Sequence, residues 1–101
     1  MSKQTKTKQL SAADAIEKAK KNSLARKQRV AKELRELCFD KIDEMVRDGV
    51  VSVYVPMNEE MQYWGLAIVQ KELEDLGYKI ILEEDENSET PDLQISIEHL
   101  K

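Results

Sequence analysis

Hydrophobic residues recur at spacings of three and four along the first half of the chain, as they do on one face of an α-helix. The stripe is weak at first and becomes strong from Val30 onward. Its strong part comprises Val30, Leu34, Leu37, Cys38, Ile42, Met45 and Val46. No Gly or Pro interrupts residues 11–48, Ser11 is a suitable N-cap, and Gly49 is a natural C-terminal stop. The pattern therefore predicts one long helix over residues 11–49, with a length of roughly 55 Å.

Three short runs in the second half of the chain have the composition of β-strands. Residues 50–55 are β-branched and aromatic, residues 78–83 are rich in isoleucine, and residues 93–98 alternate strictly between hydrophobic and polar. Between the first two runs, residues 58–76 carry a second helical stripe that begins at a capping Asn58. The order α-β-α-β-β predicts an α+β fold, a two-layer α/β sandwich with a three-stranded mixed sheet. The sheet is expected to be mixed because a β-α-β unit has parallel strands, whereas the last strand returns antiparallel.

Alternation within these strands separates a hydrophobic face, which both helices are expected to cover, from a mostly polar face. The hydrophobic face comprises Val51, Val53, Val55, Ile80, Leu82, Leu93, Ile95 and Ile97. Tyr54 and Ile81 are the hydrophobic exceptions on the polar face. Together with Tyr63, which projects away from the stripe of the second helix, they are candidates for a partner surface. The alternative is that they are ordinary exposed residues.

The length of 101 residues is sufficient for one domain. We expect a disordered basic arm at residues 1–10, the long helix at residues 11–49 with its first half projecting, and a βαββ domain at residues 50–101 packed on the second half of that helix. No hydrophobic run is long enough to span a bilayer, the N-terminus has no secretory signal, and a single cysteine cannot form a disulfide within the chain. These features favour a cytoplasmic protein without a membrane partner.

The net charge of −4 is the sum of two parts with opposite sign. Residues 1–36 carry eleven Lys or Arg and four Asp or Glu, whereas residues 37–101 carry five and sixteen, so their net charges are +7 and −11. The basic part of the long helix contains the candidates for contacts with nucleic-acid phosphates. They are Lys18, Lys20, Lys21, Arg26, Lys27 and Arg29. No aromatic residue lies among them, so base stacking is not expected, and the alternative is a solvated helix face.

The weak part of the hydrophobic stripe is longer than one small sheet can cover. Ile16, Ala19, Ser23 and Val30 are therefore the candidates for a homo-oligomer interface. The small residues among them allow another helix to approach closely, although the absence of a leucine heptad argues against a strong coiled coil. The alternative is a simple surface helix.

The sequence contains no catalytic signature. Cys38 lies within the hydrophobic stripe and is interpreted as a small core residue, and His99, the only histidine, lies close to the C-terminus. The acidic run at residues 83–89 lacks the spacing and the glycine of an EF-hand, and no glycine-rich phosphate loop is present. We therefore predict a protein that is not an enzyme and that uses no cofactor or metal.

Several local motifs resemble those of small accessory proteins encoded by tailed phages and prophages. They are a capped Ser-Ala-x-x-Ala start (Ser11, Ala12, Ala15), a Gly followed by a Ser-Val strand (Gly49 to Val53), a helix that ends in Leu-Gly-Tyr (Leu76, Gly77, Tyr78), and an Ile-Ser-hydrophobic strand (Ile95, Ser96, Ile97). In the phage proteins the last strand often ends with Trp, where this chain has Ile97. The resemblance implies a phage origin, an accessory role in the host cytoplasm, and no particular site residue.

The leading hypothesis is a non-enzymatic accessory protein that binds proteins and self-associates through its long N-terminal helix. Two alternatives remain open. One is an accessory factor that binds nucleic acid through the basic helix at residues 18–35. The other is an inhibitor whose acidic surface occupies the basic site of a host nucleic-acid enzyme.

Overall fold

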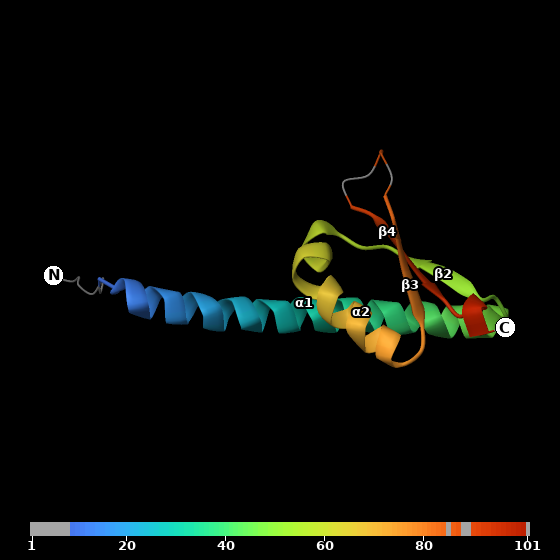
Figure 1. Ribbon diagram of the computed structural model, residues 1–101, viewed down its shortest axis with the longest axis horizontal. Helices are drawn as coiled ribbons and strands as arrows, with labels where there is room; N and C mark the ends of the chain where they lie inside the picture. Colours follow the sequence, from blue (N-terminus) through green and yellow to red (C-terminus); the bar gives the residue numbers. More distant parts are fainter. Residues whose placement is uncertain (1–8, 85, 88–89, 101) are drawn as a thin grey trace.

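One helix extends along the whole molecule, and every later element lies on its C-terminal half (Figure 1). The computed structural model describes residues 9–84, 86–87 and 90–100. Its elements are α1 (Ala12–Asp48), β2 (Ser52–Val55), η1 (Met61–Gly65), α2 (Leu66–Asp75), β3 (Lys79–Glu83), β4 (Asp92–Ser96) and η2 (Glu98–Leu100). This order confirms the predicted α-β-α-β-β arrangement, with the short 3₁₀ helix η2 added at the end. Most of the predicted basic arm, residues 1–8, lies outside the described residues.

Both ends of α1 are capped by the residues that the sequence analysis predicted. The Ser11 side chain accepts a hydrogen bond of 3.1 Å from the backbone N–H of Asp14, which satisfies one free donor in the first turn. Gly49 ends the helix with a φ of 70°, a left-handed conformation that favours glycine. Its N–H donates to the carbonyl of Val46. Between these caps α1 is a single helix of 37 residues.

The sheet differs from the prediction in its pairing, because β4 lies between β2 and β3 and is antiparallel to both. The sheet is therefore antiparallel throughout and not mixed. The strands β2 and β3 do run in the same direction, as a β-α-β connection requires, but they are not neighbours. The strictly alternating β4 takes the central position, where Leu93 and Ile95 are fully buried. A central strand buries more hydrophobic surface than an edge strand, so the most regularly alternating strand gains most from this place.

The two predicted faces of the sheet are confirmed by the strand register. Val53, Ile95 and Ile80 form one row across the three strands, and the next row on the same face is Val55, Leu93 and Leu82. The opposite face carries the row Tyr54, Gln94 and Ile81. Residues of α1 and α2 share one core with Val55, Leu93 and Ile95, so both helices cover the first face. The opposite face forms the open side of the two-layer sandwich.

The second helix begins where predicted but contains a π-helical turn. Asn58 caps it by accepting a hydrogen bond of 2.8 Å from the N–H of Met61, and the π-helical segment η1 leads directly into α2. At the junction Gly65 is buried against α1. A Cβ added there would lie 3.1 Å from the Cα and the N of Ala31. The two helices can therefore approach this closely only because Gly65 has no side chain.

Candidate protein-binding surface on the projecting helix

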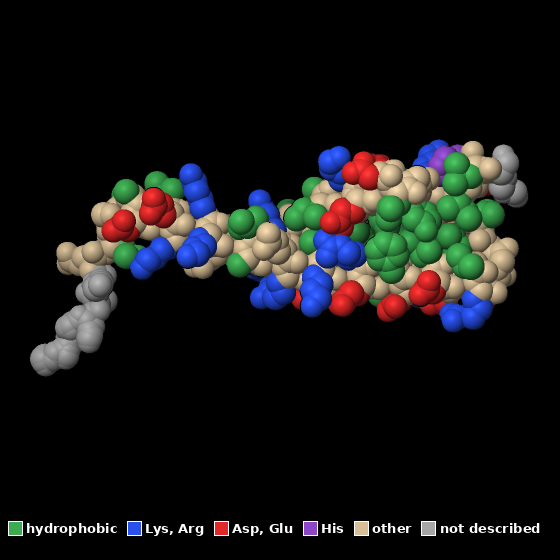
Figure 2. Space-filling view, turned by 90° about the horizontal axis from the view of Figure 1, so that it is seen from below, with side chains coloured by type: hydrophobic (Ala, Val, Ile, Leu, Met, Phe, Trp, Pro, Cys, Tyr) green, Lys and Arg blue, Asp and Glu red, His purple; other side chains and the backbone are tan. Residues whose placement is uncertain are grey.

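The first part of α1 extends away from the rest of the molecule (Figures 1 and 2). We call residues 12–25 the projecting half, and the C-terminal part of α1 with all later elements the lobe. In the projecting half every residue is exposed except the half-buried Ser23. The molecule measures 67 × 31 × 21 Å, and its radius of gyration is 19.1 Å, whereas a compact domain of this length has about 13 Å. An exposed helix of this kind gains no stability from the core of its own chain.

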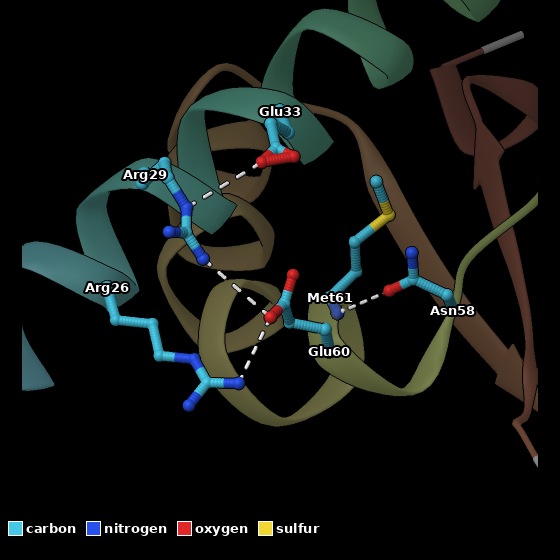
Figure 3. Close-up of polar contacts among 6 residues, drawn as sticks. All are labelled: Arg26, Arg29, Glu33, Asn58, Glu60 and Met61. Carbon is cyan, nitrogen blue, oxygen red and sulfur yellow. Dashed lines mark hydrogen bonds and ion pairs between the residues drawn. The ribbon is translucent and has the colours of Figure 1, made fainter.

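A cluster of charged residues marks the point where α1 leaves the lobe (Figure 3). Nη2 of Arg26 lies 3.0 Å from Oε2 of Glu60, and Nη2 of Arg29 lies 3.7 Å from the same oxygen. Arg29 also reaches Glu33, one turn further along α1. The guanidinium of Arg26 lies over the ring of Trp64, 4.6 Å from its centroid. These exposed ion pairs contribute about 0.2–1 kcal/mol each, and together they hold the base of the projecting half against η1.

The structure divides the predicted oligomer residues into two groups. Ile16, Ala19 and Ser23 lie on the projecting half, and the side chain of Ile16 is 55% exposed. Val30 is only 1% exposed, because η1 crosses α1 at this level and covers it. Its assignment to an interface was therefore wrong, since Val30 belongs to the core of the lobe.

Sequence reasoning missed Leu24, which is also 55% exposed. Leu24 follows Ile16 by eight residues and therefore lies near it on the helix surface, a spacing that could have identified it. A shallow hollow on this face is lined by Ala19, Lys20, Ser23, Leu24 and Lys27. The projecting half thus presents two large hydrophobic side chains beside small residues and lysines.

The six predicted nucleic-acid contacts also fall into two groups. Arg26 and Arg29 are paired with Glu60 of the lobe. In the described part of the chain, no ion pair involves the other four residues, Lys18, Lys20, Lys21 and Lys27. Arg26 and Arg29 therefore differ from the four lysines in that a phosphate would compete with Glu60 for them.

The three residues predicted to form one partner surface lie on two different sides of the sheet. Tyr54 and Ile81 flank Gln94 on the open face of the sheet. Tyr63 is 78% exposed but belongs to η1, in the helical layer on the other side of the sheet. The hydroxyl of Tyr54 donates a hydrogen bond of 3.1 Å to Oε1 of Glu83, and this bond raises the pKa of Tyr54. Only Tyr54 and Ile81 can therefore contact the same partner segment.

The lobe carries a hydrophobic surface that sequence reasoning did not identify. Arg35 of α1 donates two hydrogen bonds to the carboxylate of Glu72 on α2, at 2.8 and 2.9 Å. One turn further along each helix lie the exposed Phe39 and Leu76, and Val46 follows Phe39 on α1. Figure 2 shows hydrophobic side chains gathered on this side of the lobe. We call Phe39, Val46 and Leu76 the lobe patch; Phe39 and Val46 lie on α1, and Leu76 lies directly after the end of α2 at Asp75.

Cys38 and His99, the two residues considered for catalysis, both contact the fold of the lobe. Cys38 is buried in the core, and burial raises the pKa of its thiol to about 11. Nε2 of His99 lies 3.0 Å from the carbonyl oxygen of Gly77. Within the described ranges no group of three or more His, Cys, Asp or Glu side chains could hold a metal ion. No helix in the same ranges is long and hydrophobic enough to cross a membrane.

No protein-family model matches the chain, and neither the curated proteins nor the solved structures contain a match to it.

Proposed function

We propose that this protein is a non-enzymatic binding protein that self-associates through the projecting half of α1. The observation that carries the proposal is the exposure of Ile16 and Leu24 on a helical segment against which none of the described residues of the lobe buries them. Burying two such side chains stabilises an interface by about 1.5–3 kcal/mol each. Ala19 and Ser23 between them leave room for a second helix to approach.

The charges along α1 identify the surface that fits the projecting half. The projecting half, residues 12–25, contains three Lys and two Asp or Glu, a net charge of +1, and Lys20 and Lys27 line its hollow. Residues 36–48 contain two Lys or Arg and five Asp or Glu, a net charge of −3. Phe39 and Val46 of the lobe patch lie on this acidic part of α1. The projecting half of one copy is therefore complementary to the lobe patch of another mainly through its exposed hydrophobic residues, with Lys20 and Lys27 beside them to meet the acidic part of α1.

Sedimentation velocity of the full chain up to high micromolar concentration tests this proposal. We expect concentration-dependent self-association that is lost when Ile16→Glu and Leu24→Glu are combined, while the free energy of unfolding stays unchanged because neither residue lies in the core. The matched control combines Ala15→Glu with Ala25→Glu, which add the same charge on the other side of the helix. A wild-type protein whose association does not change with the Ile16 and Leu24 substitutions would contradict the proposal.

An accessory role in a phage-infected cell is the setting that the sequence resemblance suggests, and it remains a prediction. Pull-down from a bacterial lysate with the wild-type protein and the variant with both glutamates tests whether the same face also binds a host or phage protein. Loss of a captured protein in this variant, but not in the Ala15 and Ala25 control, is the expected result.

A further inference from the structure

The outer edge of β3 is open. β4 has strand partners on both sides, whereas β3 contacts β4 on one side and α2 across its face. Lys79 and Glu83 are exposed at its two ends, and Leu82 is 41% exposed although it faces the helical layer. In an antiparallel ladder alternate residues direct their N–H and C=O groups toward opposite sides. β3 therefore has backbone donors and acceptors along an edge that no other described strand covers.

The sequence of β3 is complementary to itself when one copy is turned about Ile81. Antiparallel pairing with Ile81 opposite Ile81 of a second copy places Lys79 opposite Glu83, twice. It also places Ile80 opposite Leu82, twice, on the face toward the helices. Opposite charges and hydrophobic pairs that face each other directly across two strands stabilise a sheet. This one register therefore pairs opposite charges on one face of the strand and hydrophobic residues on the other face.

We propose that β3 is the site of a second, two-fold symmetric interface, in which it pairs antiparallel with β3 of another copy to form a six-stranded sheet. This interface is separate from the projecting half of α1 and does not depend on it. The partner is a second copy because the Lys79–Glu83 complementarity is present within one strand. Oε1 of Glu83 accepts the Tyr54 hydroxyl, and Lys79 of the second copy would form an ion pair with the same carboxylate.

Other pairings are less favourable. A shift of one residue would bring the hydrophobic face of one strand to the polar face of the other. A shift of two residues would separate Lys79 from Glu83. The other sheet edge, β2, contacts α1 and is followed immediately by Pro56, which has no N–H to donate. β3 is therefore the edge strand of this sheet at which a strand of another copy can pair.

Single-cysteine crosslinking under mild oxidation tests the register. Directly opposite residues have Cα atoms about 4.5–5.5 Å apart, within the range of about 4.4–6.8 Å that a disulfide spans. Ile81→Cys should therefore form covalent dimers rapidly. Lys79→Cys should not crosslink to itself, because the two copies of residue 79 are roughly 13 Å apart, but a mixture of Lys79→Cys and Glu83→Cys should form heterodimers. The native Cys38 is buried and adds little background.

Lys32→Cys, an exposed position on α1, is the matched control for crosslinking. If Ile81→Cys forms dimers no faster than Lys32→Cys, β3 is not the interface. If Lys79→Cys crosslinks to itself as fast as Ile81→Cys, the proposed register is wrong. The measurement is made on the full chain that also carries Ile16→Glu and Leu24→Glu, so failure of the α1 proposal does not affect its outcome.

Charge exchange tests the same interface without a covalent bond. In that background, Lys79→Glu and Glu83→Lys should each raise the dimer dissociation constant about tenfold, because two attractive pairs become repulsive. The double variant Lys79→Glu with Glu83→Lys should restore the wild-type value, since it exchanges the two ends of the strand. Lys32→Glu is the control for charge reversal and should have no effect. Equal dissociation constants for all these variants, or a double variant as weak as the single ones, would overturn the proposal.

Discussion

At the scale of single residues, the position of the two helices depends on Gly65. Ala31 of α1 approaches it so closely that even a methyl group would contact the Ala31 backbone at 3.1 Å. The atoms in the way are Cα and N, so a side-chain rotation cannot relieve the contact. The backbone separation of the two helices is therefore set by one glycine in a buried turn of η1.

Replacing Gly65 with Ala should destabilise the protein by about 1–3 kcal/mol, because the helices must move apart and the core must repack. Helix propensity alone predicts the opposite, since Ala is favoured over Gly by about 1 kcal/mol inside a helix. Urea unfolding followed by circular dichroism distinguishes these two expectations by the sign of the change in the free energy of unfolding. An increase in the free energy of unfolding would show that the close contact does not determine the effect.

The buried thiol of Cys38 should make stability depend on pH in the alkaline range. Its pKa is raised from an ordinary value near 9 to about 11, so the folded state holds the thiol proton more tightly than the unfolded state. The associated stabilisation is present below pH 9 and is lost as the pH rises toward 11, a change on the order of 2 kcal/mol. Tyr54 also has a raised pKa, so the comparison is between wild type and Cys38→Ala. The pH dependence of urea unfolding should be smaller in Cys38→Ala, and identical slopes would contradict this prediction.

At the scale of elements, α1 is one helix with two different sources of stability. From Val30 onward it is held by burial against the sheet and η1. Among the described residues, the projecting half is held by its own backbone hydrogen bonds and the Ser11 cap, and isolated helices shorter than about 12–15 residues are marginal in water. The ion pairs of Arg26 and Arg29 with Glu60 lie at the boundary between these two parts of α1.

Hydrogen exchange should therefore show two levels of protection along α1. In the variant that combines Ile16→Glu with Leu24→Glu, amides of residues 12–25 should exchange orders of magnitude faster than those of residues 30–46, which open only with the whole lobe. In wild-type protein at high concentration, protection of residues 12–25 should increase as the proposed interface forms. Equal protection of both segments in the variant would show that the projecting half is stable by itself.

At the scale of the whole molecule, the two proposed interfaces lie on different parts of an elongated chain. One uses the projecting half and the lobe patch, and the other uses the edge of β3. The β3 edge pairs with itself, whereas the projecting half pairs with the lobe patch of another copy, so a protein that uses both interfaces can extend beyond a dimer.

Light scattering should accordingly detect wild-type particles larger than a dimer at high concentration. The variant with Ile16→Glu and Leu24→Glu should stop at a dimer formed through β3, and Lys79→Glu, which weakens the β3 interface about tenfold, should shift the particles toward smaller sizes. When all three substitutions are combined, the remaining dimer should form only at about tenfold higher protein concentration. A wild-type protein that never exceeds a dimer would show that only one of the two interfaces exists.

Local chemistry was sufficient to predict most elements of this fold. The caps at Ser11, Gly49 and Asn58 and the alternation of hydrophobic residues in three strands depend only on neighbours along the chain. These signals predicted the order of elements, the single long helix and the two faces of the sheet, and the structure confirms all three.

The burial of individual residues and the order of the strands in the sheet depend on the tertiary structure and could not be predicted from local sequence patterns. Periodicity shows that Val30 and Ile16 lie on the same side of α1, but only the crossing of η1 buries Val30 and leaves Ile16 exposed. The β-α-β order fixed the directions of β2 and β3, whereas the insertion of β4 between them depends on contacts between strands far apart in sequence. The lobe patch and the open edge of β3 likewise follow from where neighbouring elements end. A chain encodes which face of each element is hydrophobic, and the packing of distant elements determines which part of that face remains exposed to a partner.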